Sequence, residues 1–288
     1  MLAPVIIFAY KRLDSVKRTV ESLASCKYAD QTELFIFCDG PRNDVDLKAT
    51  NAVRKYLRSI AGFRNITLSF SEKNNGLAAS IIQGVSKIHE SYDSVIVLED
   101  DLELAPNFLA YMNAALNFYA EDKRVFSISG YNIPMAVDEN YEYDIYFTPR
   151  ASSWGWASWK DRWQKVDWDV KDFNEFRKDK QKIKAFNNGG SDLFKMLSKR
   201  MNGEIDSWAI RWCYSQYKNN LLSVYPVVSK VQNIGFDEAA TNSNVYNRYI
   251  TKLDSGESMD FKFSNNDSLD ERFYKQFLDF YGDRKSVV

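Results

Sequence analysis

The chain of 288 residues is 45% hydrophobic and 15% aromatic, a composition typical of a globular protein with an ample core. Its 38 Lys and Arg residues nearly balance its 39 Asp and Glu residues, so no global basic field attracts nucleic acid, and we expect no nucleic-acid partner. The apolar run at residues 5–9 is too short for a signal peptide or a membrane span, so we expect at most peripheral membrane contact.

Cysteine and histidine usage excludes several kinds of site. Cys26, Cys38 and Cys213 are odd in number and form no C-x-x-C pair, which argues against a disulfide framework or a zinc site and favours a reducing cytoplasm. The single histidine, His89, stands among polar neighbours, and we expect it at the surface. On that expectation, a histidine-based metal site or a Ser-His-Asp triad is excluded.

Strands and helices alternate in the first half of the chain. Apolar, β-branched runs predict strands at residues 5–8, 34–38, 66–71, 95–98 and 125–129, and helical spacing predicts helices at 13–25, 47–60, 77–90 and 106–119. This alternation is typical of a parallel sheet with crossover helices. The predicted fold class is therefore α/β, with a parallel sheet and crossover helices.

The alternation decays beyond about residue 125. Residues 131–146 are irregular and acidic. All seven tryptophans lie between Trp154 and Trp212, which indicates one patch rich in aromatic rings. The aromatic segment 273–281 predicts a terminal helix that docks on the body or on a partner. We divide the chain into a half at 1–130, a half at 131–250 and a C-terminal extension at 251–288.

Three adjacent acids, Glu99, Asp100 and Asp101, directly follow the apolar strand at 95–98. The carboxyl ends of strands are where open α/β sheets bind ligands. Three adjacent carboxylates repel one another, and hard oxygen ligands suit Mg²⁺ or Mn²⁺ that also carries a substrate's phosphates. A metal–diphosphate site is one interpretation, and a solvated acidic turn leading to the helix that Pro106 starts is the other.

Residues at the ends of the neighbouring strands are further candidates. Asp39 could accept hydrogen bonds from a nucleobase or a ribose, or could cap the following helix. Tyr10 could stack on a base, and Arg12 could pair with phosphate or be a plain surface charge. Asn75 lies in the turn 74–76, whose backbone N–H groups could seat an anion or simply start a helix. No glycine-rich phosphate loop follows any strand.

The segment 98–108, LEDDLELAPNF, resembles the metal-binding segment of nucleotide-sugar glycosyltransferases of the GT-A fold. The likeness is closest to the N-acetylglucosaminyltransferase I family and extends to bacterial family 2-like sugar transferases. It implies the α/β fold called GT-A, a Rossmann-like, mixed but mostly parallel sheet flanked by helices in a single catalytic domain. It implies that Asp101 binds Mn²⁺ or Mg²⁺, and that Glu99 and Asp100 face the sugar and ribose of the donor. It also implies that Arg12 and Asp39 hold the uracil end, so that residues 1–130 bind the nucleotide sugar.

Two later segments carry the same resemblance into the half that would bind the acceptor. The segment 147–156 resembles the family's loop beside the donor sugar, in which Gly155 allows close approach and Trp154 or Trp156 stacks on a sugar face; core filling is the alternative for each ring.

The segment 203–208, GEIDSW, resembles the family's Asp-x-Trp segment. The resemblance implies that Asp206 is the catalytic base, with Glu204 as the fallback and a helix cap as the structural alternative. The family's closing loop carries a histidine, which residues 233–242 lack.

The sequence thus predicts a metal-dependent inverting glycosyltransferase. It would move a sugar from a nucleoside diphosphate sugar, with UDP as the expected nucleotide, to a hydroxyl of a glycan or lipid-linked acceptor. We expect a role in bacterial surface polysaccharide synthesis, in the cytoplasm, with lipid-linked acceptors met at the inner membrane face.

Two other classes of protein are alternatives. A sugar-1-phosphate nucleotidylyltransferase should carry a glycine-rich basic loop after the first strand, where residues 10–14 contain no glycine. A non-catalytic carbohydrate-binding protein would use the tryptophans to hold a glycan.

Overall fold

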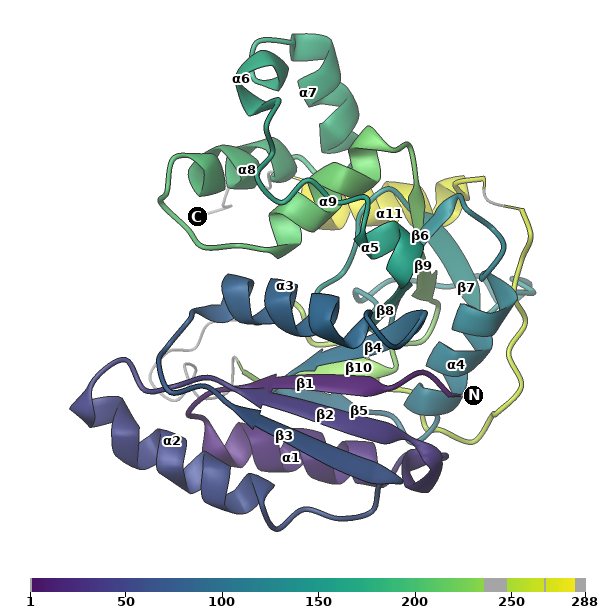
Figure 1. Ribbon diagram of the computed structural model, residues 1–288. Helices are drawn as coiled ribbons and strands as arrows, with labels where there is room; N and C mark the ends of the chain where they lie inside the picture. Colours follow the sequence, from purple (N-terminus) through teal and green to yellow (C-terminus); the bar gives the residue numbers. More distant parts are fainter. Residues whose placement is uncertain (1, 236–247, 267, 283–288) are drawn as a thin grey trace.

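An eight-stranded sheet runs through the protein in a computed structural model that describes residues 2–235, 248–266 and 268–282 (Figure 1). The strand order is β3-β2-β1-β4-β8-β6-β9-β7, in which β1 to β4 are mutually parallel, β6 and β9 are parallel, and β8 and β7 run antiparallel to their neighbours. The strands are β1 (Val5–Ala9), β2 (Glu33–Cys38), β3 (Asn65–Phe70), β4 (Ser94–Glu99), β6 (Val125–Ser129), β7 (Ile145–Thr148), β8 (Trp156–Trp159) and β9 (Leu222–Pro226).

Helices cover both faces of this sheet and divide the core into two clusters. One face packs against α1 (Leu13–Ala24), α2 (Asp44–Leu57), α4 (Phe108–Phe118) and α11 (Glu271–Tyr281). The other face packs against α3 (Leu77–Ile88), α5 (Lys160–Trp163), α6 (Phe173–Phe176), α7 (Lys180–Phe186), α8 (Leu193–Met201) and α9 (Ala209–Lys218). Short 3₁₀ turns lie at Ala29–Gln31 and Asn187–Gly189.

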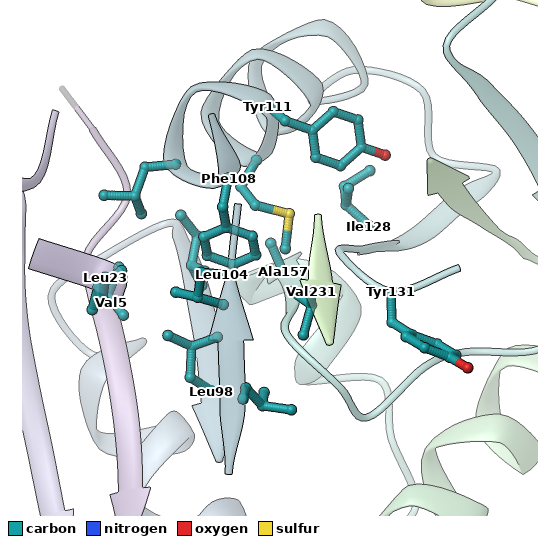
Figure 2. Packing of buried hydrophobic residues seen from close by; sticks show 14 of the residues in the cluster. Val5, Leu23, Leu98, Leu104, Phe108, Tyr111, Ile128, Tyr131, Ala157 and Val231 are labelled. Atoms are coloured by element: carbon teal, nitrogen blue, oxygen red, sulfur yellow. The ribbon is translucent and has the colours of Figure 1, made fainter. Parts of the chain in front are cut away.

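The central strands are apolar on both faces because alternate residues enter different clusters. In β4, Ile96 and Leu98 join the first cluster, whereas Val95 and Val97 join the second. A small sheet of β5 (Leu102–Leu104) and β10 (Val231–Asn233) lies beside the end of β4. Figure 2 shows Leu98, Leu104 and Val231 gathered around Phe108, so the chain is anchored by apolar side chains on both sides of the acidic triplet.

The predicted elements of the first half are confirmed, with shifts of a few residues at their ends. The fourth predicted helix begins at Phe108 rather than at Pro106, and Asn107 occupies its N-terminal boundary. The predicted terminal helix is confirmed as α11, which docks on the body through Phe273 and Phe277. The later strands β7, β8 and β9, which complete the mixed sheet, were not among the predicted elements.

His89 was expected at the surface, and this expectation is wrong. The residue is 2% exposed, with its Nδ1 atom 3.0 Å from the carbonyl oxygen of Tyr92 and its ring near Trp163. Burial lowers the pKa of His89, so its neutral form is favoured in the folded protein. The residue follows the last residue of α3, Ile88, and polar neighbours in sequence do not determine on which side of a helix end a side chain lies.

All three cysteines are buried and free, which agrees with the absence of a disulfide framework. Among the described residues, no helix is both long and apolar enough to cross a bilayer.

The burial of His89 predicts a specific pH dependence of stability. Because the folded-state pKa lies below the unfolded value, the contribution of His89 is complete above pH about 6.5 and is lost as the pH falls below that value. Because this is the chain's only histidine, His89→Gln should remove one component of acid sensitivity, worth at most about 1.4 kcal/mol per pH unit. Urea unfolding of both proteins between pH 5 and 7 measures the difference. Parallel pH profiles for the two proteins would contradict this assignment.

Candidate functional site

The carboxyl ends of β1, β2 and β4 meet at one edge of the sheet and surround a pocket. The parallel register places Ala9 beside Cys38 and Phe8 beside Glu99, so the residues that follow these strands converge. A pocket of about 240 Å³ lies there. Its lining contains five residues expected from the sequence, Tyr10, Arg12, Asp39, Glu99 and Asp100, and three cationic or amide residues that were not, Lys11, Arg42 and Asn74.

Arg12 is the counter-ion of the acidic triplet. Its Nη2 atom donates to Asp100 Oδ1 at 2.5 Å and lies 3.0 Å from Asp101 Oδ2. The second oxygen of Asp100 accepts the backbone N–H of Tyr10 at 3.1 Å. Although burial lowers the pKa of Arg12, the two carboxylates more than offset that effect and raise it above its ordinary value. The guanidinium therefore stays charged and holds two buried acids together.

Asp101 has the properties of a cation ligand. The residue is 8% exposed, and its Oδ1 atom is buried without a hydrogen-bond partner among the described residues. A buried carboxylate oxygen that is left unpaired is costly, and a hard cation is a suitable partner for it. No group of three or more metal-ligating side chains converges in the described part of the chain. The unpaired oxygen of Asp101 fits an ion that is also held by substrate phosphates and water.

Glu99 is held in a different way. Burial, followed by the charges of Asp101 and Asp100, raises the pKa of Glu99 to about 8, while Arg12 and a hydrogen bond from Trp208 act in the opposite direction. At neutral pH its carboxyl group therefore favours the protonated form. Trp208, whose contact with Glu99 was not expected from the sequence, brings the loop before α9 to the end of β4.

Asp39 caps a turn. Its Oδ1 accepts N–H groups from Gly40 and Asn75, both at 2.9 Å, and its Oδ2 accepts those of Asn75 and Gly76 at 3.1 and 3.0 Å. A nucleobase would have to displace one of these bonds to reach the carboxylate. The helix that follows β2 is capped by Asn43 instead, so Asp39 acts on the turn before α3 rather than on the next helix.

The anion seat proposed at the turn 74–76 requires a correction. Its backbone N–H groups at Asn75 and Gly76 already bind the carboxylate of Asp39, which is the anion in this seat. The side chain of Asn75 donates to Ser71 Oγ and lies outside the lining of the pocket around Tyr10.

Tyr10 and its cationic neighbours form one wall of the pocket. The Tyr10 hydroxyl donates to Asp46 Oδ2 at 2.6 Å, and Lys11 Nζ lies 2.7 Å from Asp46 Oδ1. Arg42 approaches the Tyr10 ring and donates to Asn74 at 3.4 Å. Lys11 and Arg42 each follow a strand closely, and that position at a carboxyl end was the signal that could have identified them.

Asp206 lies beside this pocket. A Cβ atom at Gly76 would be 3.5 Å from Asp206 Oδ2, and Gly76 lines the pocket. The side chain of Asp206 is 60% exposed, and its Oδ1 atom lies 3.8 Å from Arg200 Nε. It caps no helix, because Ser207 Oγ accepts the N–H of Ile210 at the start of α9. The exposed Glu204 instead accepts a hydrogen bond from Asn202.

The segment 154–156 contributes less to an open site than the sequence suggested. Trp156 is 1% exposed and packs inside the core, so it is not available to stack on a sugar, and its assignment is corrected. Gly155 has φ +58°, and a Cβ atom there would lie 2.7 Å from Val231 Cγ2, so the close approach is internal. Trp154 is half-buried, with edge contacts to Tyr131 and Tyr249.

The tryptophan concentration reflects packing. Five of the seven tryptophans are buried, and rings from β8, α5 and α9 contact one another at centroid distances of 5.1 to 5.6 Å. A glycan-binding protein needs its rings on the surface, so this cluster gives the carbohydrate-binding alternative no support. Of the closing loop at 233–242, residues 236–242 lie outside the described part of the chain.

Comparisons with known proteins show the family of this chain. A sequence model of the GNT-I family matches residues 1–186, more than half of the chain. The chain is 26% identical over 190 residues to the alpha-1,3-mannosyl-glycoprotein 2-beta-N-acetylglucosaminyltransferase of Arabidopsis thaliana. That match covers 58% of this chain and 41% of the plant protein, so the chain spans less than half the length of this relative.

Solved structures give more distant similarities. The mannosyltransferase PcManGT from Pyrobaculum calidifontis, in complex with GDP-Man and Mn²⁺, shows 16% identity and a TM-score of 0.39, covering 56% of this chain and 46% of its own. TarS 1–349 of S. aureus shows 13% identity and a TM-score of 0.42, and the match covers 80% of this chain and 58% of TarS 1–349. A putative glucose-1-phosphate thymidylyltransferase from Bacillus anthracis shows 12% identity and a TM-score of 0.40, and the match covers 86% of this chain and 98% of that protein. Structures with TM-scores this low are too dissimilar to indicate a function for this chain.

The capping role of Asp39 predicts a loss of stability in Asp39→Asn. An amide nitrogen in place of either oxygen faces backbone donors and leaves them unpaired, which should cost about 1–3 kcal/mol of unfolding free energy. Denaturant unfolding measures the effect, with Asp30→Asn, at an exposed position, as the matched control. Equal stability of wild type and Asp39→Asn would show that the carboxylate is not held by the turn.

Proposed function

This chain belongs to the GNT-I family and has the GT-A arrangement of a mixed, mostly parallel sheet between helices, and from that premise we propose that it is a glycosyltransferase. The reaction we propose is metal-dependent transfer, with inversion, of a sugar from a UDP-sugar to a hydroxyl of a glycan or glycolipid. The biological setting we propose is the synthesis of a bacterial surface polysaccharide.

One observation carries the proposal. Asp101 has a buried carboxylate oxygen with no hydrogen-bond partner among the described residues, and its other oxygen pairs with Arg12, which lines the pocket at the carboxyl ends of three parallel strands. This pocket also has Lys11, Arg12 and Arg42 in its lining. Cations around a cleft suit a diphosphate, and a carboxylate suits the divalent cation that accompanies it.

Asp101 would hold Mn²⁺ or Mg²⁺, which when bound would offset the negative charge that develops on the departing nucleoside diphosphate. Arg12 and Arg42 would bind phosphate oxygens, for which a guanidinium is well shaped. The ring of Tyr10 would contact the base. Glu99 would face the donor from the end of β4.

Asp206 would act as the general base. An acceptor hydroxyl is a weak nucleophile at neutral pH, and a carboxylate beside it takes its proton as it attacks the anomeric carbon. The exposed side chain of Asp206 can reach an acceptor, and its neighbour Gly76 connects it to the donor pocket. A single displacement from the face opposite the leaving group gives inversion.

The nucleotidylyltransferase alternative receives no support from the loop after β1. That alternative calls for glycines that cradle phosphates through backbone N–H groups. Here the loop contains no glycine, and Arg12 directly precedes α1 while its side chain is engaged with two acids.

Calorimetric titration of UDP with and without Mn²⁺ tests the donor site. We expect binding that requires Mn²⁺ in the wild type and is lost in Asp101→Ala, because that variant removes the proposed ligand oxygen. Glu103→Ala, which removes a surface carboxylate two residues away, should bind like the wild type. UDP binding that is indifferent to both Mn²⁺ and Asp101 would contradict the proposed metal site.

The base assignment is tested by Asp206→Asn. This variant should bind UDP normally but lose roughly 10²–10⁴-fold in turnover, the usual contribution of a general base. Glu204→Gln is the matched control and should retain turnover, because Glu204 contacts Asn202 rather than the pocket. Steady-state transfer from UDP-sugars measures both. If Glu204→Gln loses turnover and Asp206→Asn does not, the base is Glu204.

A further inference from the structure

Arg12 occupies a position between the acidic triplet and the donor pocket. Its Nη2 atom contacts both Asp100 and Asp101, while the same side chain lines the pocket that we assign to the nucleotide. We propose that Arg12 is a built-in counter-ion that competes with the divalent cation for Asp101 and is drawn off by the donor's diphosphate. This inference rests on the proposed function and adds a mechanism that controls when the metal binds.

The burial of the carboxylates explains why a resident counter-ion is needed. The side chains of Asp100 and Asp101 are 7% and 11% exposed, whereas that of Arg12 is 35% exposed. Buried charges without a partner are strongly destabilising, so the acids require a cation even when no metal is bound. Arg12 supplies it from the more exposed side of the cluster.

Gly235 closes the other side of this cluster. A Cβ atom there would lie 2.2 Å from Asp101 Oδ2 and 3.0 Å from Arg12 Nη1, so only a glycine leaves room for the ion pair. The backbone N–H of Ile234 donates to the carbonyl oxygen of Asp101 at 2.8 Å and fixes this approach. Gly235 and the acids therefore border the guanidinium, and the same side chain lines the pocket.

Two cations cannot share Asp101 without cost. A divalent ion bound at Asp101 lies close to the positive guanidinium, and the two repel each other. Phosphate oxygens in the pocket offer Arg12 an alternative partner of suitable shape, which relieves the competition. Because such coupling is reciprocal, the diphosphate favours the metal and the metal favours the diphosphate. The metal site would then be completed only when a donor is present.

The test is the affinity for Mn²⁺ alone, measured by electron paramagnetic resonance of free Mn²⁺. Arg12→Gln removes the competing charge, and we expect it to bind Mn²⁺ about tenfold more tightly than the wild type, equivalent to about 1.4 kcal/mol. Arg12→Lys keeps the charge and should remain near the wild type. Arg18→Gln, which breaks a surface pair with Glu103, is the matched control and should change nothing. Unchanged or weaker Mn²⁺ binding in Arg12→Gln overturns the proposal.

Two further variants make the result specific. Adding Asp101→Ala to Arg12→Gln should abolish the increase in Mn²⁺ affinity, because it removes the carboxylate that would bind the metal. An increase in affinity that survives in the double variant overturns the proposal. If repulsion among the acids unfolds Arg12→Gln, the comparison is made in the Asp100→Asn background, where one negative charge is absent. There the added Arg12→Gln must still tighten Mn²⁺ binding.

Failure of this inference is distinguishable from failure of the proposed function. Metal-dependent UDP binding in the wild type, with unchanged Mn²⁺ affinity in Arg12→Gln, removes the counter-ion role and leaves the transferase. Tighter Mn²⁺ binding in Arg12→Gln, with no UDP binding by any variant, supports the counter-ion role and removes the proposed donor site.

Discussion

The burial of adjacent carboxylates at the end of a central strand is the constraint on which this structure depends. Removing such groups from water costs several kcal/mol each unless charges and hydrogen bonds compensate. Here several neighbours compensate the charge. Arg12 pairs with Asp100 and Asp101, and the backbone N–H of Tyr10 donates to the second carboxylate oxygen of Asp100. Glu99 instead favours its proton and accepts a hydrogen bond from Trp208. Arg12 and Tyr10, which compensate this charge, also line the pocket.

The fold of the first half was predictable because each element has a strong local signal. Buried parallel strands are continuous apolar runs, and the intervening helices have apolar residues at helical spacing. The second half lacks such signals, since β8 is only Trp156–Trp159 and lies buried in the middle of the sheet. Four buried residues with two tryptophans suggest a ring-lined loop as readily as a strand. The pairing of this segment with β4 on one side and β6 on the other distinguishes the two.

The candidate site was predictable to the extent that strand ends converge. Arg12 and Asp100 were identified from their positions after strands, and the structure brings them together. The hydrogen-bond partners of Asp39 could not be inferred, because the turn whose N–H groups bind its carboxylate is distant in sequence. The contact between Trp208 and Glu99 depends on how α9 packs, which no local pattern encodes.

The place of β8 between β4 and β6 has a consequence for how the chain folds. These two strands follow each other among the long strands of the chain, yet neither obtains its inner neighbour until residues 156–159 are in position. Pairings between distant segments close large loops before they gain stability, so assembly of this sheet should be slow and all-or-none. The two halves are therefore not exchangeable modules: a chain cut near residue 130 would expose the edges of two apolar strands to aggregation.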